Sequence, residues 1–128
     1  MPTPFETIIP GQRRAWRLRV DHEEEAFVQF DLLGKSHWKL KILEISPVGV
    51  GFRLQDGRPS LMVGTRLDKV SLHVVGLRIM GTLLVAHVTR GLGADMICGA
   101  EFLPSTEADE WTMALLVRCL EKRDPQPN

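Results

Sequence analysis

The stretch AFVQFDL, Ala26–Leu32, decides the fold, because apolar side chains return at every second position. An alternation of period two is typical of a β-strand that buries one face. The same pattern continues, interrupted by turn residues, through 38–42, 48–54, 70–74, 77–89 and 96–103. Many short strands separated by turns predict an all-β domain in the form of a closed antiparallel barrel, not an α/β sheet.

The C-terminal segment changes to a helical period. Residues 104–106, Pro-Ser-Thr, supply a stop and a cap, and acidic residues crowd the first turn, where the helix dipole favours anions. One face is apolar and consists of Met113, Leu116, Val117 and Leu120. The pattern predicts one amphipathic helix of roughly four turns that packs on the barrel.

The bulk properties indicate one ordinary globular domain of 128 residues. We assign the domain to residues 12–123, with an N-terminal extension at 1–11 and a disordered tail at 124–128. Sixteen basic and sixteen acidic side chains cancel, which disfavours a general binder of DNA or RNA. The chain has neither a membrane-spanning apolar run nor the apolar stretch of a signal peptide, so we expect a cytoplasmic protein without a membrane partner.

Several single residues are interpreted as structural. Cys98 and Cys119 are predicted to be buried free thiols, which fits a reducing compartment. Trp38 and Trp111 are expected to pack in the barrel and the helix. The four histidines show no metal-ligand spacing, and no catalytic triad, carboxylate pair or phosphate loop stands out, so neither a metal site nor an enzyme is predicted.

A basic segment precedes the first strand. Four arginines and a tryptophan fall within the seven residues 13–19, in a chain whose net charge is zero. Arginine suits an anionic ligand, because its planar fork donates two parallel hydrogen bonds to a phosphate or a base edge and also stacks on flat rings. The segment therefore reads either as an arm that wraps around an anion or as a solvated basic entry to the barrel.

A second motif lies at a predicted strand junction, in the stretch LEISPVGVGF at 43–52. Glu44 and Ser46 are two residues apart, so on a regular strand they face the same side. Gly49 allows a turn with close approach to a ligand. A carboxylate can accept hydrogen bonds from a guanine edge and a serine hydroxyl can donate to a phosphate. The alternative is a plain β-turn with a serine hydroxyl and a glycine.

The two motifs together resemble those of PilZ domains, bacterial receptors for the second messenger cyclic di-GMP. The segment RRAWR at 13–17 is similar to their R-x-x-x-R signature, and EISPVG at 44–49 is similar to [D/N]-x-S-x-x-G. A third likeness is CGAEFL at 98–103, which is followed by the acidic start of the last helix. The resemblance spans residues 12–120 and implies a six-stranded antiparallel β-barrel with a C-terminal helix.

The resemblance also implies a ligand and roles for six residues. Cyclic di-GMP would be bound with Arg13 and Arg17 on a guanine edge and the phosphates, and with Arg14 assisting. Ser46 and Gly49 would hold a phosphate and leave space for the base, and Glu44 would take the guanine Watson–Crick edge. The protein would act as a small effector, without enzymatic activity or cofactor, in control of motility, biofilm or exopolysaccharide through a protein partner, and a homodimer is a further option.

One departure from the family pattern leaves alternatives open. Glu44 stands where the family has Asp or Asn, and its extra methylene moves the acceptor by roughly 1.5 Å, the length of a single bond. A nucleotide-independent adaptor, for example in type IV pilus assembly, is the second reading. A register with Arg14 and Arg19 as the working pair is another option. His87 reads as an ordinary strand histidine, with a place near a second base as the alternative.

Overall fold

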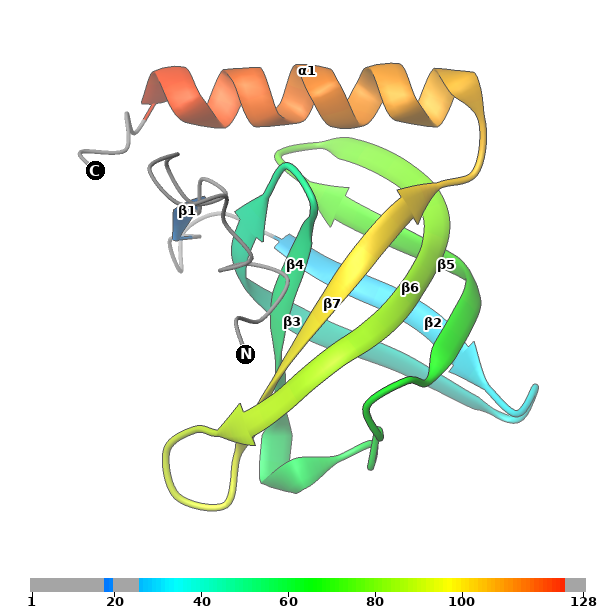
Figure 1. Cartoon of the computed structure of the whole chain (residues 1–128), viewed down its shortest axis with the longest axis vertical. Helices are drawn as coiled ribbons and strands as arrows, with labels where there is room; N and C mark the ends of the chain where they lie inside the picture. The colour runs from blue at the N-terminus through cyan, green and yellow to red at the C-terminus, as the bar shows by residue number, and fades with distance from the viewer. Residues whose placement is uncertain (1–17, 20–25, 124–128) are drawn as a thin grey trace.

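Six strands follow one another around a barrel, and one helix follows the last of them (Figure 1). This computed structural model describes residues 18–19 and 26–123, with side chains at 26–120. The elements are β1 (Leu18–Arg19), β2 (Ala26–Leu32), β3 (Ser36–Ser46), β4 (Gly49–Leu54), the 3-10 turn η1 (Gln55–Gly57), β5 (Arg66–Val74), β6 (Leu77–Arg90), β7 (Met96–Pro104) and α1 (Glu107–Arg123).

The sheet is antiparallel throughout and closes on itself. Its strands run in the order β3, β2, β5, β6, β7, β4, and β4 pairs again with β3. The predicted six-stranded antiparallel β-barrel with a C-terminal helix is therefore confirmed. The short strand β1 was not predicted, because two residues carry no readable period. It pairs with the outer edge of β3, where Leu18 faces Ile45 and Arg19 faces Glu44.

The alternation read from the sequence fills the barrel interior. Inward side chains without exposed surface come from most strands and include Val28, Ile42, Phe52, Leu72, Ile79 and Leu83. Burial of each such side chain stabilises the fold by about 1.5–3 kcal/mol relative to leaving it in water. The outward positions of the same strands hold the polar residues. The inner face of the sheet therefore lines the core, and we call its outer face the wall of the barrel.

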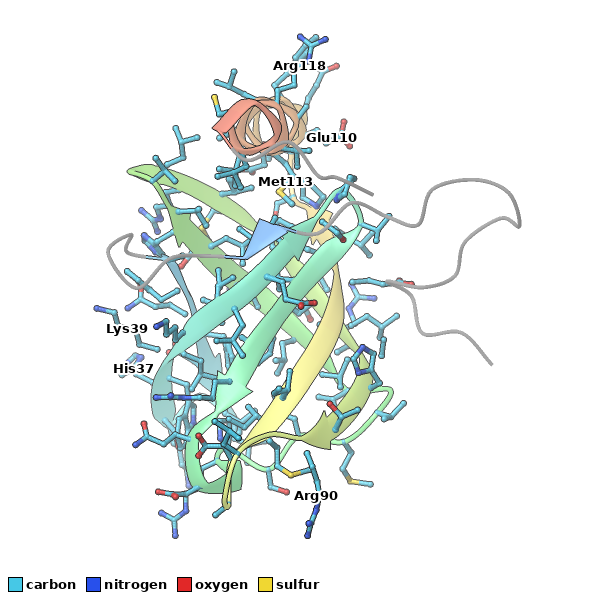
Figure 2. All side chains as sticks on the ribbon, turned by 90° about the vertical axis from the view of Figure 1, so that its left-hand side faces the viewer. His37, Lys39, Arg90, Glu110, Met113 and Arg118 are labelled. Atoms are coloured by element: carbon cyan, nitrogen blue, oxygen red, sulfur yellow. The ribbon has the colours of Figure 1, made fainter. Side chains whose placement is uncertain are left out.

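The helix α1 lies across one end of the barrel, as Figures 1 and 2 show from perpendicular directions. Met113, Leu116 and Leu120 are buried, and α1 packs mainly on β6 and β7. The Thr106 hydroxyl accepts a hydrogen bond from the Asp109 N–H at 3.1 Å, as expected for an N-cap. The Asp109 carboxylate in turn accepts the Met80 N–H at 3.0 Å, which ties the start of α1 to β6.

Two single-residue predictions are wrong. Trp111 is 72% exposed on α1 and packs against nothing in the core, whereas Trp38 is half-buried against it as expected. Cys119 is exposed, whereas Cys98 is a buried free thiol. Both errors fall on the outer side of α1, where residue type alone did not show which face of the helix meets the barrel. Among the described residues, no helix is long and apolar enough to span a membrane.

Candidate functional site

The turn between β3 and β4 is built by the side chain of Ser46. Its hydroxyl oxygen accepts the backbone N–H of Val48 at 3.3 Å and that of Gly49 at 3.2 Å, and the hydroxyl lies 3.5 Å from the Gly49 carbonyl oxygen. Ser46 has no exposed surface. The serine therefore satisfies two backbone donors inside its own turn, as the plain β-turn interpretation predicts. Its predicted contact with a phosphate stays a prediction.

Gly49 lies against the backbone of the neighbouring strand. It pairs with Glu101 of β7, and a Cβ placed on it would lie 2.1 Å from the Ala100 carbonyl oxygen. No side chain fits there, so glycine is needed for the closure of β4 onto β7. The sequence motif predicts that this glycine makes room for a ligand. In the structure, Gly49 allows the backbones of β4 and β7 to approach each other closely. A ligand contact at Gly49 stays a prediction.

A β-bulge turns Glu44 to the outer wall. Between the pairs Ile42–Phe52 and Glu44–Gly51, β3 advances by two residues and β4 by one. Ile42 and Ile45 are both fully buried although they are three positions apart, so the bulge shifts the inward phase by one residue. Without it, Glu44 would continue the inward series of Leu40 and Ile42. Bulges are frequent beside functional sites because they re-aim side chains.

A second bulge does the same for His87. Between the pairs Val85–Ala100 and His87–Gly99, β6 advances by two residues and β7 by one. Val85 is buried and Val88 packs against the core, so His87 between them takes an outward position. The alternation before the bulge would have placed it inside the barrel.

The two bulged positions lie in one row across the wall. Glu44 pairs with Gly51, Gly51 with Gly99, and Gly99 with His87, from β3 through β4 and β7 to β6. A Cβ on Gly51 would lie 3.3 Å from the Glu44 Cγ and 3.6 Å from its Oε1, so the carboxylate side chain extends over this glycine. We call Gly51 and Gly99 the glycine strip. The motif CGAEFL at 98–103 contains Gly99, but the alignment of Gly51 with Gly99 depends on strand register and could not be read from the sequence.

The predicted arginines Arg13, Arg14 and Arg17 lie outside the described residues. The chain just after them is described, and β1 pairs directly beside the second motif, with Leu18 opposite Ile45 and Arg19 opposite Glu44. The end of the arginine segment and the Glu44–Gly49 junction thus meet at one edge of β3. Arg19, which belongs to the alternative register of the arm, is the backbone partner of Glu44.

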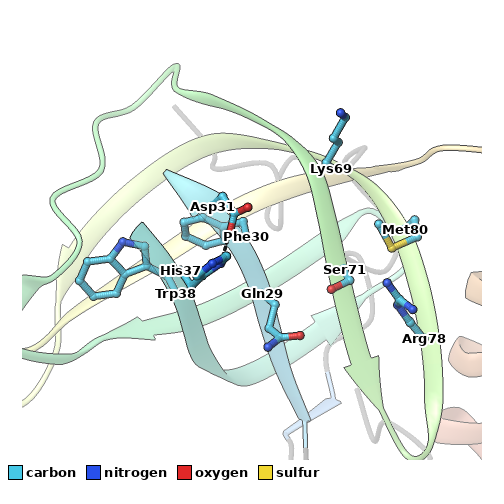
Figure 3. A pocket seen from close by; sticks show the side chains of 9 residues that line it. All are labelled: Gln29, Phe30, Asp31, His37, Trp38, Lys69, Ser71, Arg78 and Met80. Carbon is cyan, nitrogen blue, oxygen red and sulfur yellow. Dashed lines mark ion pairs between the residues drawn. The ribbon is translucent and has the colours of Figure 1, made fainter. Parts of the chain in front are cut away.

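A shallow hollow of about 200 Å³ lies on a different part of the wall, over β2, β3, β5 and β6 (Figure 3). Lys69, Arg78 and Ser71 are among its lining residues. The Ser71 hydroxyl lies 3.1 Å from Nε2 of His73. Burial, then the charges of Arg78 and Lys39, lower the pKa of His73. Of the predicted site residues that the structure describes, Glu44, Ser46 and Gly49, none lines this hollow. Among the residues that the structure describes, no group of His, Cys, Asp and Glu could hold a metal ion.

Comparison with known proteins identifies the fold from solved structures. Neither a protein-family model nor a curated protein matches the chain. Solved structures do match, among them the PilZ domain of YcgR from Escherichia coli with c-di-GMP, at 18% identity and a TM-score of 0.69, over 88% of this chain and 93% of that one. The fold is that of a PilZ domain.

Two further structures extend the PilZ likeness. The complex of MrkH from K. pneumoniae with c-di-GMP has 18% identity and a TM-score of 0.73 over 90% of this chain and 56% of that one. The inhibitor of motility MotI (DgrA) of Bacillus subtilis has 17% identity and a TM-score of 0.66 over 90% of this chain and 54% of that one. The chain thus spans about half the length of MrkH and MotI. Identities this low show the shared PilZ fold alone.

Proposed function

We propose that this protein binds cyclic di-GMP on the outer wall of the barrel between β1 and β6. The observation that carries the proposal is the pairing of β1 with β3. This pairing places Leu18 and Arg19, which directly follow Arg17 in the sequence, opposite Ile45 and Glu44. The PilZ structures of YcgR and MrkH with c-di-GMP support the choice of ligand.

Each residue has a role that follows from its chemistry. Arg13 and Arg17, with Arg14 assisting, supply planar donor forks for the phosphates and a guanine edge. Glu44 accepts hydrogen bonds from the guanine Watson–Crick edge. The Glu44 side chain extends over Gly51, and Gly99 carries no side chain, so we expect a flat ring to lie against the backbone of Gly99 beside the carboxylate. Ser46 and Gly49 contribute by holding the turn that ends the site.

The length of Glu44 is accommodated on the same wall. The Glu44 Cγ, which is the additional methylene, lies 3.3 Å from the place that a Cβ on residue 51 would take. Any residue other than glycine at position 51 would leave this methylene less space. The absence of a side chain at Gly51 therefore leaves room for the longer side chain of Glu44, the residue that departs from the family motif. Glu44→Asp withdraws the acceptor toward β3 by about the length of one bond, roughly 1.5 Å.

The test is a calorimetric titration with cyclic di-GMP. The native chain is expected to bind, and Arg13→Ala and Arg17→Ala are expected to weaken binding at least tenfold, since a charge-assisted hydrogen bond contributes about 1.5–3 kcal/mol. Arg78→Ala, an exposed arginine on the wall around the hollow, is the matched control and should bind like the native chain. Absence of heat at high micromolar ligand, with intact folding by circular dichroism, rejects the proposal.

In the cell, we infer a small cytoplasmic effector that is not an enzyme. Binding of the nucleotide would change which surface a downstream protein meets, in control of motility, biofilm or exopolysaccharide. A pull-down with and without cyclic di-GMP tests this step, and a partner set that does not change with the nucleotide contradicts it.

A second function, a nucleotide-independent protein adaptor, is favoured by one specific observation. The Ser46 hydroxyl and Gly49 both serve the fold itself, so the S-x-x-G part of the motif has a structural reason to be present. The adaptor hypothesis expects no heat in the titration and no effect of the arginine substitutions. It also expects a protein partner that co-purifies without nucleotide.

A further inference from the structure

The outer side of α1 carries an apolar pair that the fold does not use. Trp111 is 72% exposed and Leu115 is 54% exposed, one helical turn apart. The opposite side of α1 is fixed on the barrel by Met113, Leu116 and Leu120. Figure 2 looks along the helix and shows Met113 toward the barrel and Arg118 away from it. The pair is therefore presented to solvent on a rigid support.

An exposed tryptophan in such a position is suited to recognition. Tryptophan offers a large contact area with only two rotatable side-chain bonds, and it is enriched among the residues that dominate interface energies. Because α1 is already ordered by its packing, docking on this side orders few additional groups. Removal of Trp111 costs the fold little, since no core contact depends on it.

Charges flank the apolar pair in a self-complementary order. Glu107 lies one turn before Trp111, and Arg118 lies about one turn after Leu115, so the four residues share one side of the helix. Both charged side chains are exposed, and neither has an ion-pair partner among the described residues. We call Glu107, Trp111, Leu115 and Arg118 the outer stripe. Along the helix, the outer stripe thus consists of an acidic residue, two apolar residues and a basic residue.

The order of the outer stripe selects one arrangement of two copies. In an antiparallel pair with the two-fold axis at the level of Met113, Trp111 of one copy meets Leu115 of the other. Arg118 then lies opposite Ala108 of the second copy, one residue or about 1.5 Å along the axis from Glu107. A parallel pair would set like charges against each other, which is repulsive. Such a symmetric contact uses the same patch on both copies.

We propose that the outer stripe of α1 is an interface between two copies of this chain, packed antiparallel. The inference rests on α1 alone and does not depend on nucleotide binding. The outer stripe has four residues, whereas a standard stable interface has about 20–30 residues on each side. The association is therefore weak and concentration-dependent, with a dissociation constant on the order of 100 µM.

Sedimentation velocity on the full chain, from well below to well above that concentration, tests the proposal. The native chain should shift from monomer to dimer, and Trp111→Ala and Leu115→Ala should stay monomeric. Leu103→Ala is the matched control, because Leu103 is a leucine of β7 that is 56% exposed and lies outside the stripe. It should dimerise like the native chain. A native chain that stays monomeric throughout overturns the proposal.

Charge reversal tests the antiparallel arrangement separately. Glu107→Lys and Arg118→Glu, each alone, place like charges across the interface twice per dimer and should weaken dimerisation about tenfold in low salt. The combined variant restores both opposite-charge contacts and should dimerise like the native chain. A combined variant as weak as the single ones contradicts the arrangement. Circular dichroism on every variant separates these effects from loss of folding.

Discussion

Gly49 gives the sharpest test of how the motif is built. In Gly49→Ala, the new Cβ would lie 2.1 Å from the Ala100 carbonyl oxygen, whereas real Cβ atoms essentially never come within 3.0 Å of a non-bonded atom. The strands β4 and β7 would have to separate by about 0.9 Å. Overpacking of a tight contact costs about 1–3 kcal/mol or more. Loss of the 3.2 Å hydrogen bond from the Phe102 N–H to the Val48 carbonyl adds about 1 kcal/mol.

We therefore expect Gly49→Ala to lower the free energy of unfolding by about 2–4 kcal/mol and the melting temperature by about 8–16 °C. Urea and thermal unfolding followed by circular dichroism measure both quantities. The control is Gly51→Ala, where the nearest atom is the Glu44 Cγ at 3.3 Å, at the start of a side chain that can shift. Its cost should stay below about 1 kcal/mol. If Gly49→Ala is as stable as this control, the strand contact does not explain the glycine.

Three further predictions concern Ser46, the two thiols and the helix start. Ser46→Ala leaves the N–H groups of Val48 and Gly49 without their acceptor and should destabilise the protein by about 1–3 kcal/mol in urea unfolding, whereas an unchanged midpoint would contradict the role of the turn hydroxyl. Burial raises the pKa of Cys98 to about 12, so at pH 8 it is a protonated thiol, and Ellman's reagent should modify only Cys119 in the folded chain. Two equivalents in the native state, or one that survives in Cys119→Ser, would refute this. The Met80 N–H, followed by the Thr106 hydroxyl, lowers the pKa of Asp109 below its ordinary 3.8, so its stabilisation is present above pH 3.8 and is lost as the pH falls through the lower native value. Asp109→Asn should accordingly be less stable than the native chain at pH 7, and a stability gap that does not close in acid would count against this linkage.

Much of the fold could be predicted from the sequence, because alternation and capping are local properties. The inward series of Ala26–Leu32 needs only a period of two, and the cap at Thr106 needs only a hydroxyl before acidic residues. The identity of the motif residues could also be read directly, since Glu44, Ser46 and Gly49 are close in sequence. Their roles in a ligand site remain predictions, as do those of Arg13, Arg14 and Arg17.

Only the tertiary structure decided which distant residues meet. The alignment of Glu44, Gly51, Gly99 and His87 depends on the register of four strands and on two bulges. A bulge shifts the phase of a strand by one residue, and its position is set by pairing with the neighbour, not by residue type. For the same reason the close approach of Gly49 to the backbone of β7 could not be read from the sequence, and its contact with a ligand stays a prediction. Sequence periodicity determined the strands, and strand pairing determined which of their residues lie side by side.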